Sequence, residues 1–150
     1  MTVTPIVRRS TAEDDDAVAH LFEQYRAFYR VTPDLARSRE FLRERRERGE
    51  SLVWIALLDG KAVGFTQLYP VWSSLHCRRV WMLNDLFVSE SARGRGVGAA
   101  LLAAAKEHAV ATDAKYVVLT TEPHNAPARR LYERAGYRHE KEFIDYVLDL

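Results

Sequence analysis

The sequence is most constrained at residues 93–98, where Arg-Gly-Arg-Gly-Val-Gly separates the strand-like stretch 80–88 from a helix rich in Ala and Leu. Three glycines within five positions leave the backbone bare, so a ligand can approach the amide groups closely. The helix that follows directs its unpaired N–H groups and the positive end of its dipole toward the same loop. The arginines add guanidinium groups, which pair well with phosphate oxygens. The pattern therefore predicts a phosphate-binding loop at a helix N-terminus.

Length and charge limit the classes of protein that suit this loop. A chain of 150 residues is expected to form one domain over 1–150, and a formal net charge of +1 gives no electrostatic case for nucleic acid as a partner. Cys77 is the only cysteine, which excludes an intrachain disulfide and a cysteine metal cluster and fits a reducing cytoplasm. We also expect no signal peptide and no membrane span, because no long apolar run occurs.

The remaining sequence predicts a mixed α/β domain in the order β-α-α-β-β-β-α-β-α-β. Ser10 and Glu13 form a capping-box pattern before a helical repeat, and Asp59-Gly60 is a strong hairpin signal between two apolar runs. A helix capped by Asn125 is expected to stop at Gly136. The expected strands are 3–7, 52–58, 62–69, 79–88, 116–121 and 143–150, and the other expected helices begin near 10, 32 and 96.

Two other interpretations of the glycine loop were weighed. Gly94-x-Gly96-x-x-Ala99 satisfies a loose nicotinamide-dinucleotide fingerprint, but that fold places its glycine turn after the first strand and continues with parallel strands. Here the glycines follow a predicted antiparallel meander. A plain strand-to-helix turn needs one glycine rather than three flanked by arginines. Phosphate binding without a dinucleotide fold is therefore favoured.

Residues 93–98 resemble the Gln/Arg-x-x-Gly-x-Gly/Ala motif of the GNAT (GCN5-related) N-acetyltransferase superfamily. Residues 125–137 resemble a second segment of that family, Asn-x-x-Ala-x-x-Leu-Tyr-x-x-x-Gly-Phe/Tyr, and the element order matches over essentially the whole chain. The stretch 83–88 is similar to a strand of small diamine and polyamine acetyltransferases and of their histone-acetylating relatives. The resemblance implies a single-domain GNAT fold with a mostly antiparallel sheet that splays at the acetyl-CoA site.

The resemblance also implies roles for particular residues. Main-chain groups of Phe87 and Val88 are expected to bind the pantetheine arm of acetyl-CoA, with Asn125 beside it. Tyr132 matches the general acid that reprotonates the departing thiolate and also falls among the residues near the cofactor, although a packed core tyrosine is the alternative. The pyrophosphate is expected to lie on the loop and first helical turn formed by Arg93, Gly94, Arg95, Gly96, Val97, Gly98 and Ala99.

Acceptor binding is expected from residues of the first helix and of the strand 79–88. Within this family the aromatic cluster containing Tyr25 and Tyr29 lies where acceptor contacts occur, and Asn84 and Asp85 are the polar candidates on the strand. Asn84 stands where diamine acetyltransferases tend to carry a glutamate base. The base therefore stays open among Asp85, a water chain and no dedicated base, and Asp85 is the residue retained as a catalytic candidate.

The sequence thus predicts an acetyl-CoA-dependent N-acetyltransferase that acts on a primary amine by direct attack in a ternary complex. The acceptor is expected to be a polyamine, another small amine, or a lysine or N-terminal amine of a peptide. No metal is required, and no metal-ligand cluster is visible. The alternating residues 143–150 predict an edge strand, from which we expect a homodimer, and the cysteine content places it in the cytoplasm. A non-catalytic acyl-CoA-binding module and a dinucleotide-binding protein are the alternatives.

Overall fold

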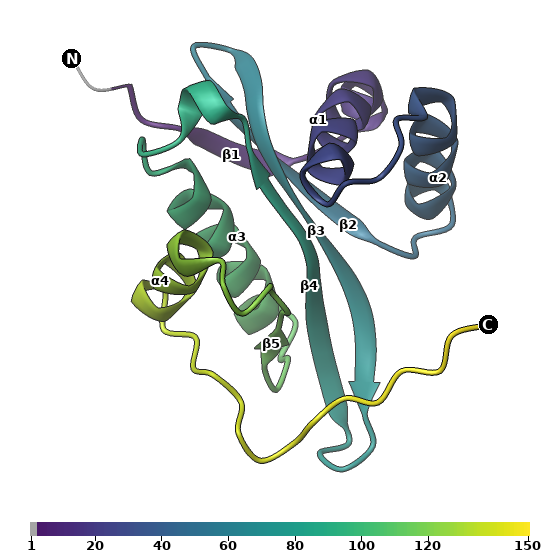
Figure 1. Cartoon of the computed structure of the whole chain (residues 1–150), viewed down its shortest axis with the longest axis vertical. Coiled ribbons are helices and arrows are strands. Elements are labelled where there is room, and N and C mark those ends of the chain that lie inside the picture. The colour runs from purple at the N-terminus through teal and green to yellow at the C-terminus, as the bar shows by residue number, and fades with distance from the viewer. Residues whose placement is uncertain (1–2) are drawn as a thin grey trace. The chain divides into compact units, whose positions relative to one another are not determined.

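The computed structural model describes residues 3–150, which form two compact units, 3–120 and 121–150 (Figure 1). Each unit is described by itself. The first contains a five-stranded sheet with three α-helices. Its elements are β1 (Ile6–Arg9), α1 (Asp15–Phe28), α2 (Leu35–Glu47), β2 (Leu52–Leu58), β3 (Lys61–Ser73), β4 (Arg78–Val88), α3 (Val97–Ala111) and β5 (Val117–Val118), with short 3₁₀ turns at Ala12–Asp14 and Glu90–Ala92.

The sheet follows chain order, β1-β2-β3-β4-β5. The first four strands pair antiparallel, and β4 pairs parallel with β5 at two positions, Trp81 with Val117 and Met82 with Val118. This confirms the mixed, mostly antiparallel sheet predicted above. It differs from the doubly wound parallel sheet of a dinucleotide-binding fold.

Helices cover both faces of the sheet in the first unit. On one face, Phe22 of α1 packs among Ile55, Phe65 and Phe87 of the strands. On the other face α3 lies close against β3, because a Cβ at Gly64 would come within 2.9 Å of the Phe87 carbonyl oxygen and 3.1 Å of Val97 Cγ1. A side chain at Gly64 would therefore push α3 away from β3 and crowd the backbone of β4.

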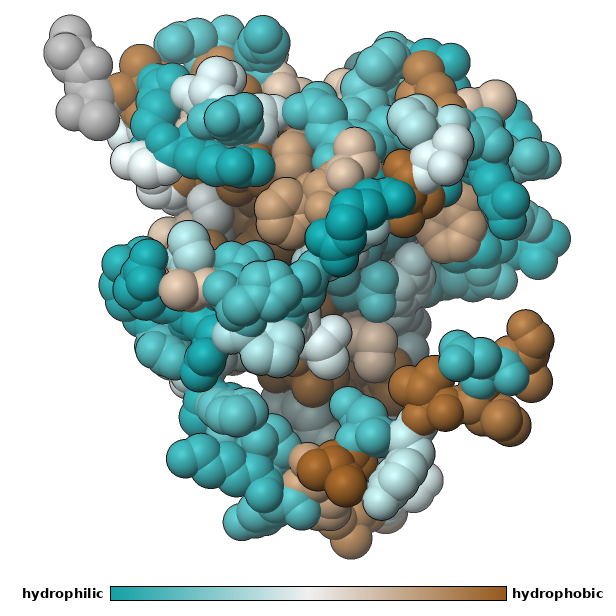
Figure 2. All heavy atoms as spheres, viewed as in Figure 1, coloured by the Kyte–Doolittle hydropathy of each residue, from teal (hydrophilic) through white to brown (hydrophobic). Residues whose placement is uncertain are grey.

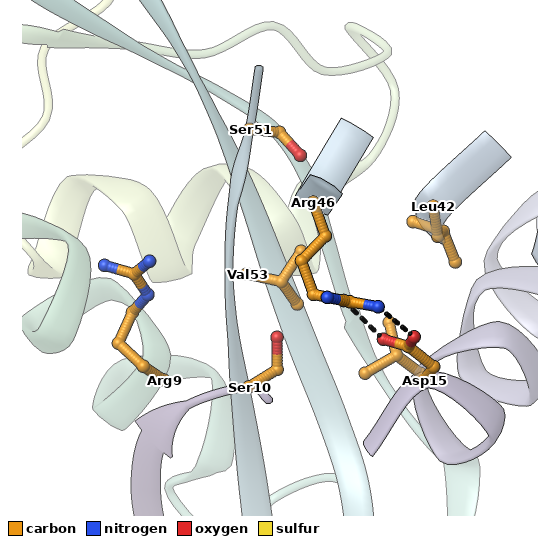
Figure 3. A pocket seen from close by; sticks show the side chains of 8 residues that line it. Arg9, Ser10, Asp15, Leu42, Arg46, Ser51 and Val53 are labelled. Atoms are coloured by element: carbon orange, nitrogen blue, oxygen red, sulfur yellow. Dashed lines mark hydrogen bonds and ion pairs between the residues drawn. The ribbon is translucent and has the colours of Figure 1, made fainter. Parts of the chain in front are cut away.

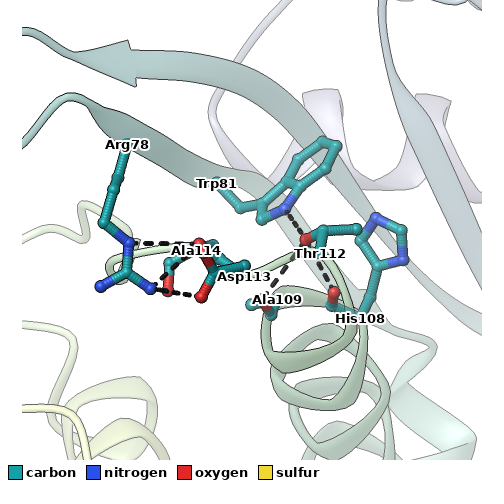
Figure 4. A network of polar contacts seen from close by, with 7 residues as sticks. All are labelled: Arg78, Trp81, His108, Ala109, Thr112, Asp113 and Ala114. Atoms are coloured by element: carbon teal, nitrogen blue, oxygen red, sulfur yellow. Dashed lines mark hydrogen bonds and ion pairs between the residues drawn. The ribbon is translucent and has the colours of Figure 1, made fainter.

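A polar network ties the far end of α3 to the start of β4 (Figure 4). Trp81 Nε1 donates to Thr112 Oγ1 at 2.8 Å, and Arg78 Nη2 reaches Asp113 Oδ1 at 2.7 Å. His108 lies between two indoles, with ring centroids 5.0 Å from Trp54 and 4.8 Å from Trp81. These contacts fix the helix that begins at the glycine loop to the strand that precedes it.

The 3₁₀ turn that leads into α1 begins at Ala12, one residue later than the capping pattern in the sequence indicates. Thr11 N donates to Asp14 Oδ2 at 2.8 Å, so the capping pair is Thr11 and Asp14 rather than Ser10 and Glu13. Arg8 binds the same carboxylate at 2.7 Å, and its hydrogen bond holds the pKa of Asp14 at about 2. Asp14 rather than Glu13 forms the capping pair because it also binds Arg8 on β1. That tertiary contact has no signal in the local sequence pattern.

The β3–β4 hairpin is longer than predicted, since β3 continues from Tyr69 through Pro70 to Ser73. Pro70 is tolerated because the last β2 partner on β3 is Leu68, so the missing N–H of Pro70 faces an edge without a strand. Cys77 is exposed in the turn at the tip, with φ +50° and its amide donating to Ser74 O. At the other end of β3, the predicted Asp59-Gly60 turn is present, with φ +50° and +76°.

The second unit contains α4 (Ala126–Arg134). Asn125 Oδ1 accepts a hydrogen bond from Ala128 N at 3.2 Å, and Gly136 follows the helix with φ +94°, so both predicted ends are confirmed. Within residues 3–150, no helix is both long enough and apolar enough to cross a membrane.

The predicted closing strand at 143–150 is wrong for this chain as described. Residues 139–150 are extended without strand pairing. Their large side chains are exposed, by 91% for Tyr146 and 84% for Leu148. Brown spheres in Figure 2 mark hydrophobic residues gathered in this C-terminal segment. Alternation in the sequence does not supply a partner, and the second unit as described offers no strand for this segment to pair with.

Candidate active site

The glycine loop leaves the start of α3 open. Gly94 and Gly96 have φ +73° and +78°, and no described atom lies within 4 Å of a Cβ built at either position. Gly96 is the N-cap of α3 and carries no side chain to bond the first-turn amides, which begin at Val97. Those amides have no partner within the helix. The loop therefore fits a phosphate group that approaches the backbone directly.

The end of β4 next to this loop has an open edge. The pairing of β4 with β5 ends at Met82. From Leu83 to Val88, β4 pairs with β3 alone among the described strands. Ser89 N donates to Val63 O at 2.8 Å, and by alternation the main chain of Val88 faces the open edge while that of Phe87 faces β3. β4 thus parts from β5 beside the predicted pantetheine site, and of the two predicted main-chain contacts Val88 faces the open edge whereas Phe87 does not. Arg93 Nε reaches the Val88 carbonyl at 3.1 Å and joins loop and strand.

A β-bulge separates Asn84 from Asp85. Gln67 pairs with Asp85 and the next residue, Leu68, pairs with Leu83, so Asn84 is the extra residue of β4. Asn84 is exposed, whereas Asp85 points inward and is 2% exposed. Tyr25 of α1 donates its hydroxyl to the Asn84 carbonyl at 3.3 Å. The bulge therefore brings three of the predicted acceptor-side residues together.

Asp85 is a buried carboxyl group with several hydrogen bonds. Gln67 Nε2 donates to Oδ2 at 2.5 Å and Asn84 Nδ2 donates to Oδ1 at 3.0 Å. Burial raises the pKa of Asp85, and the hydrogen bonds from Gln67, Asn84 and Tyr25 oppose that rise. A carboxylate with a raised pKa, held by donors, is suited to accept a proton.

Tyr25 and Tyr29 form an aromatic wall at the end of α1, with ring centroids 5.1 Å apart. The chain beyond this wall is anchored by Glu23, which accepts hydrogen bonds from Arg26 Nη1 at 2.6 Å and from Asp34 N at 2.7 Å. Ser38 of α2 donates to the same carboxylate. The α1–α2 connection next to the two tyrosines is therefore fixed.

The remaining predicted site residues, Asn125 and Tyr132, lie in the second unit. Asn125 caps α4, and Tyr132 is half-buried on that helix. The Tyr132 ring lies 6.1 Å from that of Tyr137, centroid to centroid. Burial raises the pKa of Tyr137.

A hollow of about 770 Å³ in the first unit is lined by α1, by the start of β3 and by Ser89, Glu90 and Ser91, shortly before the glycine loop. Another hollow, of about 30 Å³, is lined in part by the ion pair of Arg46 with Asp15, in which Nη2 and Oδ2 are 2.6 Å apart (Figure 3). Within residues 3–150, no three His, Cys, Asp or Glu side chains gather as metal ligands would.

The sequence interpretation did not identify three polar residues that surround Asp85 directly or through one another, namely Ser51, Gln67 and Tyr69. Ser51 Oγ donates to Gln67 Oε1 at 2.7 Å, and burial together with the Asp85 charge raises the pKa of Tyr69 to about 12. Only Gln67 leaves a signal in the sequence. It shares the inward alternation of Val63 and Phe65, so a polar side chain is directed into the core from an apolar strand.

Known proteins support this placement of the fold. The model of the "Acetyltransferase (GNAT) family" matches residues 16–137. The uncharacterized N-acetyltransferase YhfO of Bacillus subtilis strain 168 is 46% identical over 144 residues, which cover 96% of this chain and 97% of that protein. A crystal structure of a probable acetyltransferase aligns with a TM-score of 0.92 and 40% identity over 97% of both chains.

A more distant structure shares the fold alone. The aminoglycoside N-acetyltransferase AAC(6')-Iy, solved in complex with CoA, aligns with a TM-score of 0.82 at 20% identity, over 100% of this chain and 98% of that one. The family match spans most of the chain, and the similarity to the Bacillus protein extends over nearly all of it. The chain therefore belongs to the GNAT family of acetyltransferases.

Proposed function

We propose that the protein transfers the acetyl group of acetyl-CoA to a primary amine. The observation that carries the proposal is the open start of α3 beside the open edge of β4, with Asp85 held two residues before Phe87 on that same strand. Phosphate groups suit the first and an extended amide-bearing arm suits the second. The CoA bound to the distant AAC(6')-Iy supports the same choice of cosubstrate.

The proposed chemistry is direct attack within a ternary complex. The neutral amine forms a bond to the acetyl carbonyl carbon, and the carbon–sulfur bond breaks as the tetrahedral intermediate collapses. The amine proton passes to Asp85, directly or through water, and the thiolate takes a proton from Tyr132. Holding both substrates in line supplies much of the rate. The role of Tyr132 rests on its place in the family segment 125–137.

The acceptor is proposed to be a polyamine, another small amine, or a peptide lysine or N-terminus. Tyr25, Tyr29, Asn84 and Asp85 are its proposed contacts, because aromatic faces and carboxylates both attract ammonium groups. We further propose that residues 1–150 act as one domain, which is supported by a family match that crosses the boundary between the two units. A cytoplasmic location accords with the single exposed cysteine.

A homodimer is proposed from the C-terminal segment. Six large apolar side chains between Phe143 and Leu150 are exposed in the single chain, which is unusual for a monomer. Light scattering is expected to give twice the monomer mass of 17.2 kDa at micromolar concentration. A monomer mass under those conditions would overturn the dimer.

The function is tested by thiol release from acetyl-CoA in the presence of an amine panel, with product mass recorded. Spermidine, lysine, a lysine peptide and a D-amino acid represent the acceptor classes. Acetylation of at least one amine is expected. Tight acetyl-CoA binding with no acetylated product would favour a non-catalytic acyl-CoA-binding module, and stabilisation by NADH alone would favour the dinucleotide alternative.

A further inference from the structure

Asp85 on β4 is the end of a buried chain of hydrogen-bonded side chains, which runs from Ser51, just before β2, through Gln67 on β3. Ser51 Oγ donates to Gln67 Oε1 at 2.7 Å, and Gln67 Nε2 donates to Asp85 Oδ2 at 2.5 Å. Gln67 is fully buried and Ser51 is 7% exposed. Ser51 also lines the small hollow of Figure 3, at the start of β2. While Asp85 is ionised, these two hydrogen bonds favour one orientation of the buried amide.

The orientation of the Gln67 amide matters for the charge on Asp85. Because the Ser51 hydroxyl bonds to the amide oxygen, the NH₂ group is directed at the carboxylate. A donor to a carboxylate favours its ionised form, which burial disfavours. If the amide were reversed, its oxygen would face Oδ2, and Asp85 would need to be protonated to make a hydrogen bond.

We propose that Gln67, oriented by Ser51, is a positioning residue that keeps Asp85 ionised and aligned to accept the proton of the acceptor amine. This inference rests on the proposed acetyl transfer. Gln67 is assigned no contact with the amine or with acetyl-CoA, and it acts through the carboxylate to which it donates. The reversal of its amide also gives the buried pair a full set of hydrogen bonds after Asp85 has gained a proton, so neither state leaves a buried polar group unpaired.

Other groups around Asp85 set a background that stays constant in the test. Asn84 on β4 and Tyr25 on α1 also lower the pKa of Asp85, while Tyr69 on β3 faces its charge, and Arg45 of α2 acts on Tyr69. Each is unchanged in a Gln67 variant. Thr66, the neighbour of Gln67, is also fully buried and donates to the Asp85 main-chain oxygen at 2.8 Å, so it provides a matched control that leaves the carboxylate alone.

The experiment compares Gln67→Met, Ser51→Ala and Thr66→Val with the wild type. Asp85 is titrated by carboxyl carbon NMR, with its signal assigned from Asp85→Asn, and kcat/KM is measured across pH with an accepted amine. We expect Gln67→Met to raise the pKa of Asp85 and the acidic limb of kcat/KM by about one unit or more, from the usual strength of a hydrogen bond to a charged group. Acetyl-CoA Kd should stay within about twofold.

Ser51→Ala should shift both quantities in the same direction by less, and Thr66→Val should lower stability with neither shift. An unchanged Asp85 titration in folded Gln67→Met would overturn the inference, as would an equal shift in Thr66→Val. If the wild type acetylates no amine, the proposed function fails, and the NMR titration still decides whether Gln67 controls the charge of Asp85.

Discussion

The glycine loop and the Asp85 cluster differ in burial and in the groups that they present, although both are connected to β4. The loop is exposed and presents main-chain amides, with empty space where the Cβ atoms of Gly94 and Gly96 would be. The cluster is buried and consists of side chains whose polar atoms are bonded to one another, from Ser51 through Gln67 to Asp85. One region is prepared to receive a ligand, and the other is prepared to hold a charge.

This difference assigns separate tasks to the two regions. An open backbone contributes binding energy, which should appear in the acetyl-CoA Kd. A buried carboxylate with a shifted pKa contributes to proton transfer, which should appear in kcat and its pH dependence. Variants that change one quantity without the other test the separation.

The largest effect is expected for Tyr132→Phe, which extends the chemical side of the comparison to the second unit. Loss of the proposed general acid should lower kcat by roughly 10²–10⁴-fold, the usual range for one positioned proton donor. Acetyl-CoA Kd should change little, because the ring is kept. Both constants are measured on the same folded preparation.

Tyr137→Phe is the matched control, since it removes a hydroxyl from the neighbouring ring. It should leave kcat within a factor of a few of the wild type. A near-normal kcat in Tyr132→Phe, with lowered stability, would identify Tyr132 as a structural residue.

Gly96→Asp tests the binding side. A carboxylate at the N-cap of α3 would repel the pyrophosphate and occupy its approach, so the acetyl-CoA Kd should rise by roughly 100-fold or more. Calorimetry gives the Kd directly. Gly60→Asp makes the same change at another glycine, with φ +76° and open space around it, and should leave the Kd unchanged. Equal binding by folded Gly96→Asp would refute the phosphate loop.

Gly64→Ala tests how closely α3, which begins at the glycine loop, must pack against the sheet that carries Asp85. Its Cβ would lie 2.9 Å from the Phe87 carbonyl and 3.1 Å from Val97, so α3 must move away from the sheet at β3. We expect a loss of about 1–3 kcal/mol in the free energy of unfolding, typical of overpacking. Denaturant melts measure it. A variant as stable as the wild type would mean that α3 shifts freely, and its acetyl-CoA Kd would then be expected to rise.

The smallest expected effect is the pH dependence of stability that arises from His108 of α3, whose ring packs against Trp81 of β4. Burial lowers the pKa of His108, and the charges of Arg9 and Arg79 add to that direction. Because the folded pKa lies below the unfolded value of about 6.5, stability is complete above that pH and declines as pH falls below it. The Tm should fall by a few degrees at most between pH 7.5 and 5.5. His108→Leu should remove the decline that depends on this group, and an equal decline in that variant would contradict the assignment.

The two regions also differ in how far the sequence alone predicts them. The loop was predicted residue by residue, because its glycines, arginines and following helix are consecutive in the chain. The cluster was predicted only as Asn84, Asp85 and Tyr25, since Ser51 and Gln67 reach Asp85 through strand register. Register is a property of the paired sheet, and the bulge at Asn84 that places Asp85 inward has no local sequence signal.

The same reasoning explains the misplaced elements. Strand β2 was predicted with its observed bounds, because an apolar run bordered by a hairpin turn defines both ends. The strand expected at 116–121 is reduced to Val117–Val118, and 143–150 is not a strand, because each requires a partner that local alternation does not specify. Helix α4 was predicted fully, since Asn125 and Gly136 are signals within the segment itself.

The tip of the β3–β4 hairpin offers a single point of chemical attachment. Cys77 is the chain's only thiol, is exposed, and directly precedes the first residue of β4, while the glycine loop begins at Arg93, after the end of β4 at Val88. Eleven strand residues separate them, or roughly 35 Å at the usual rise per residue. A maleimide dye or a surface linker attached there would mark every molecule once, in one orientation. Immobilised or fluorescent enzyme is thus available without engineering a cysteine or approaching the loop.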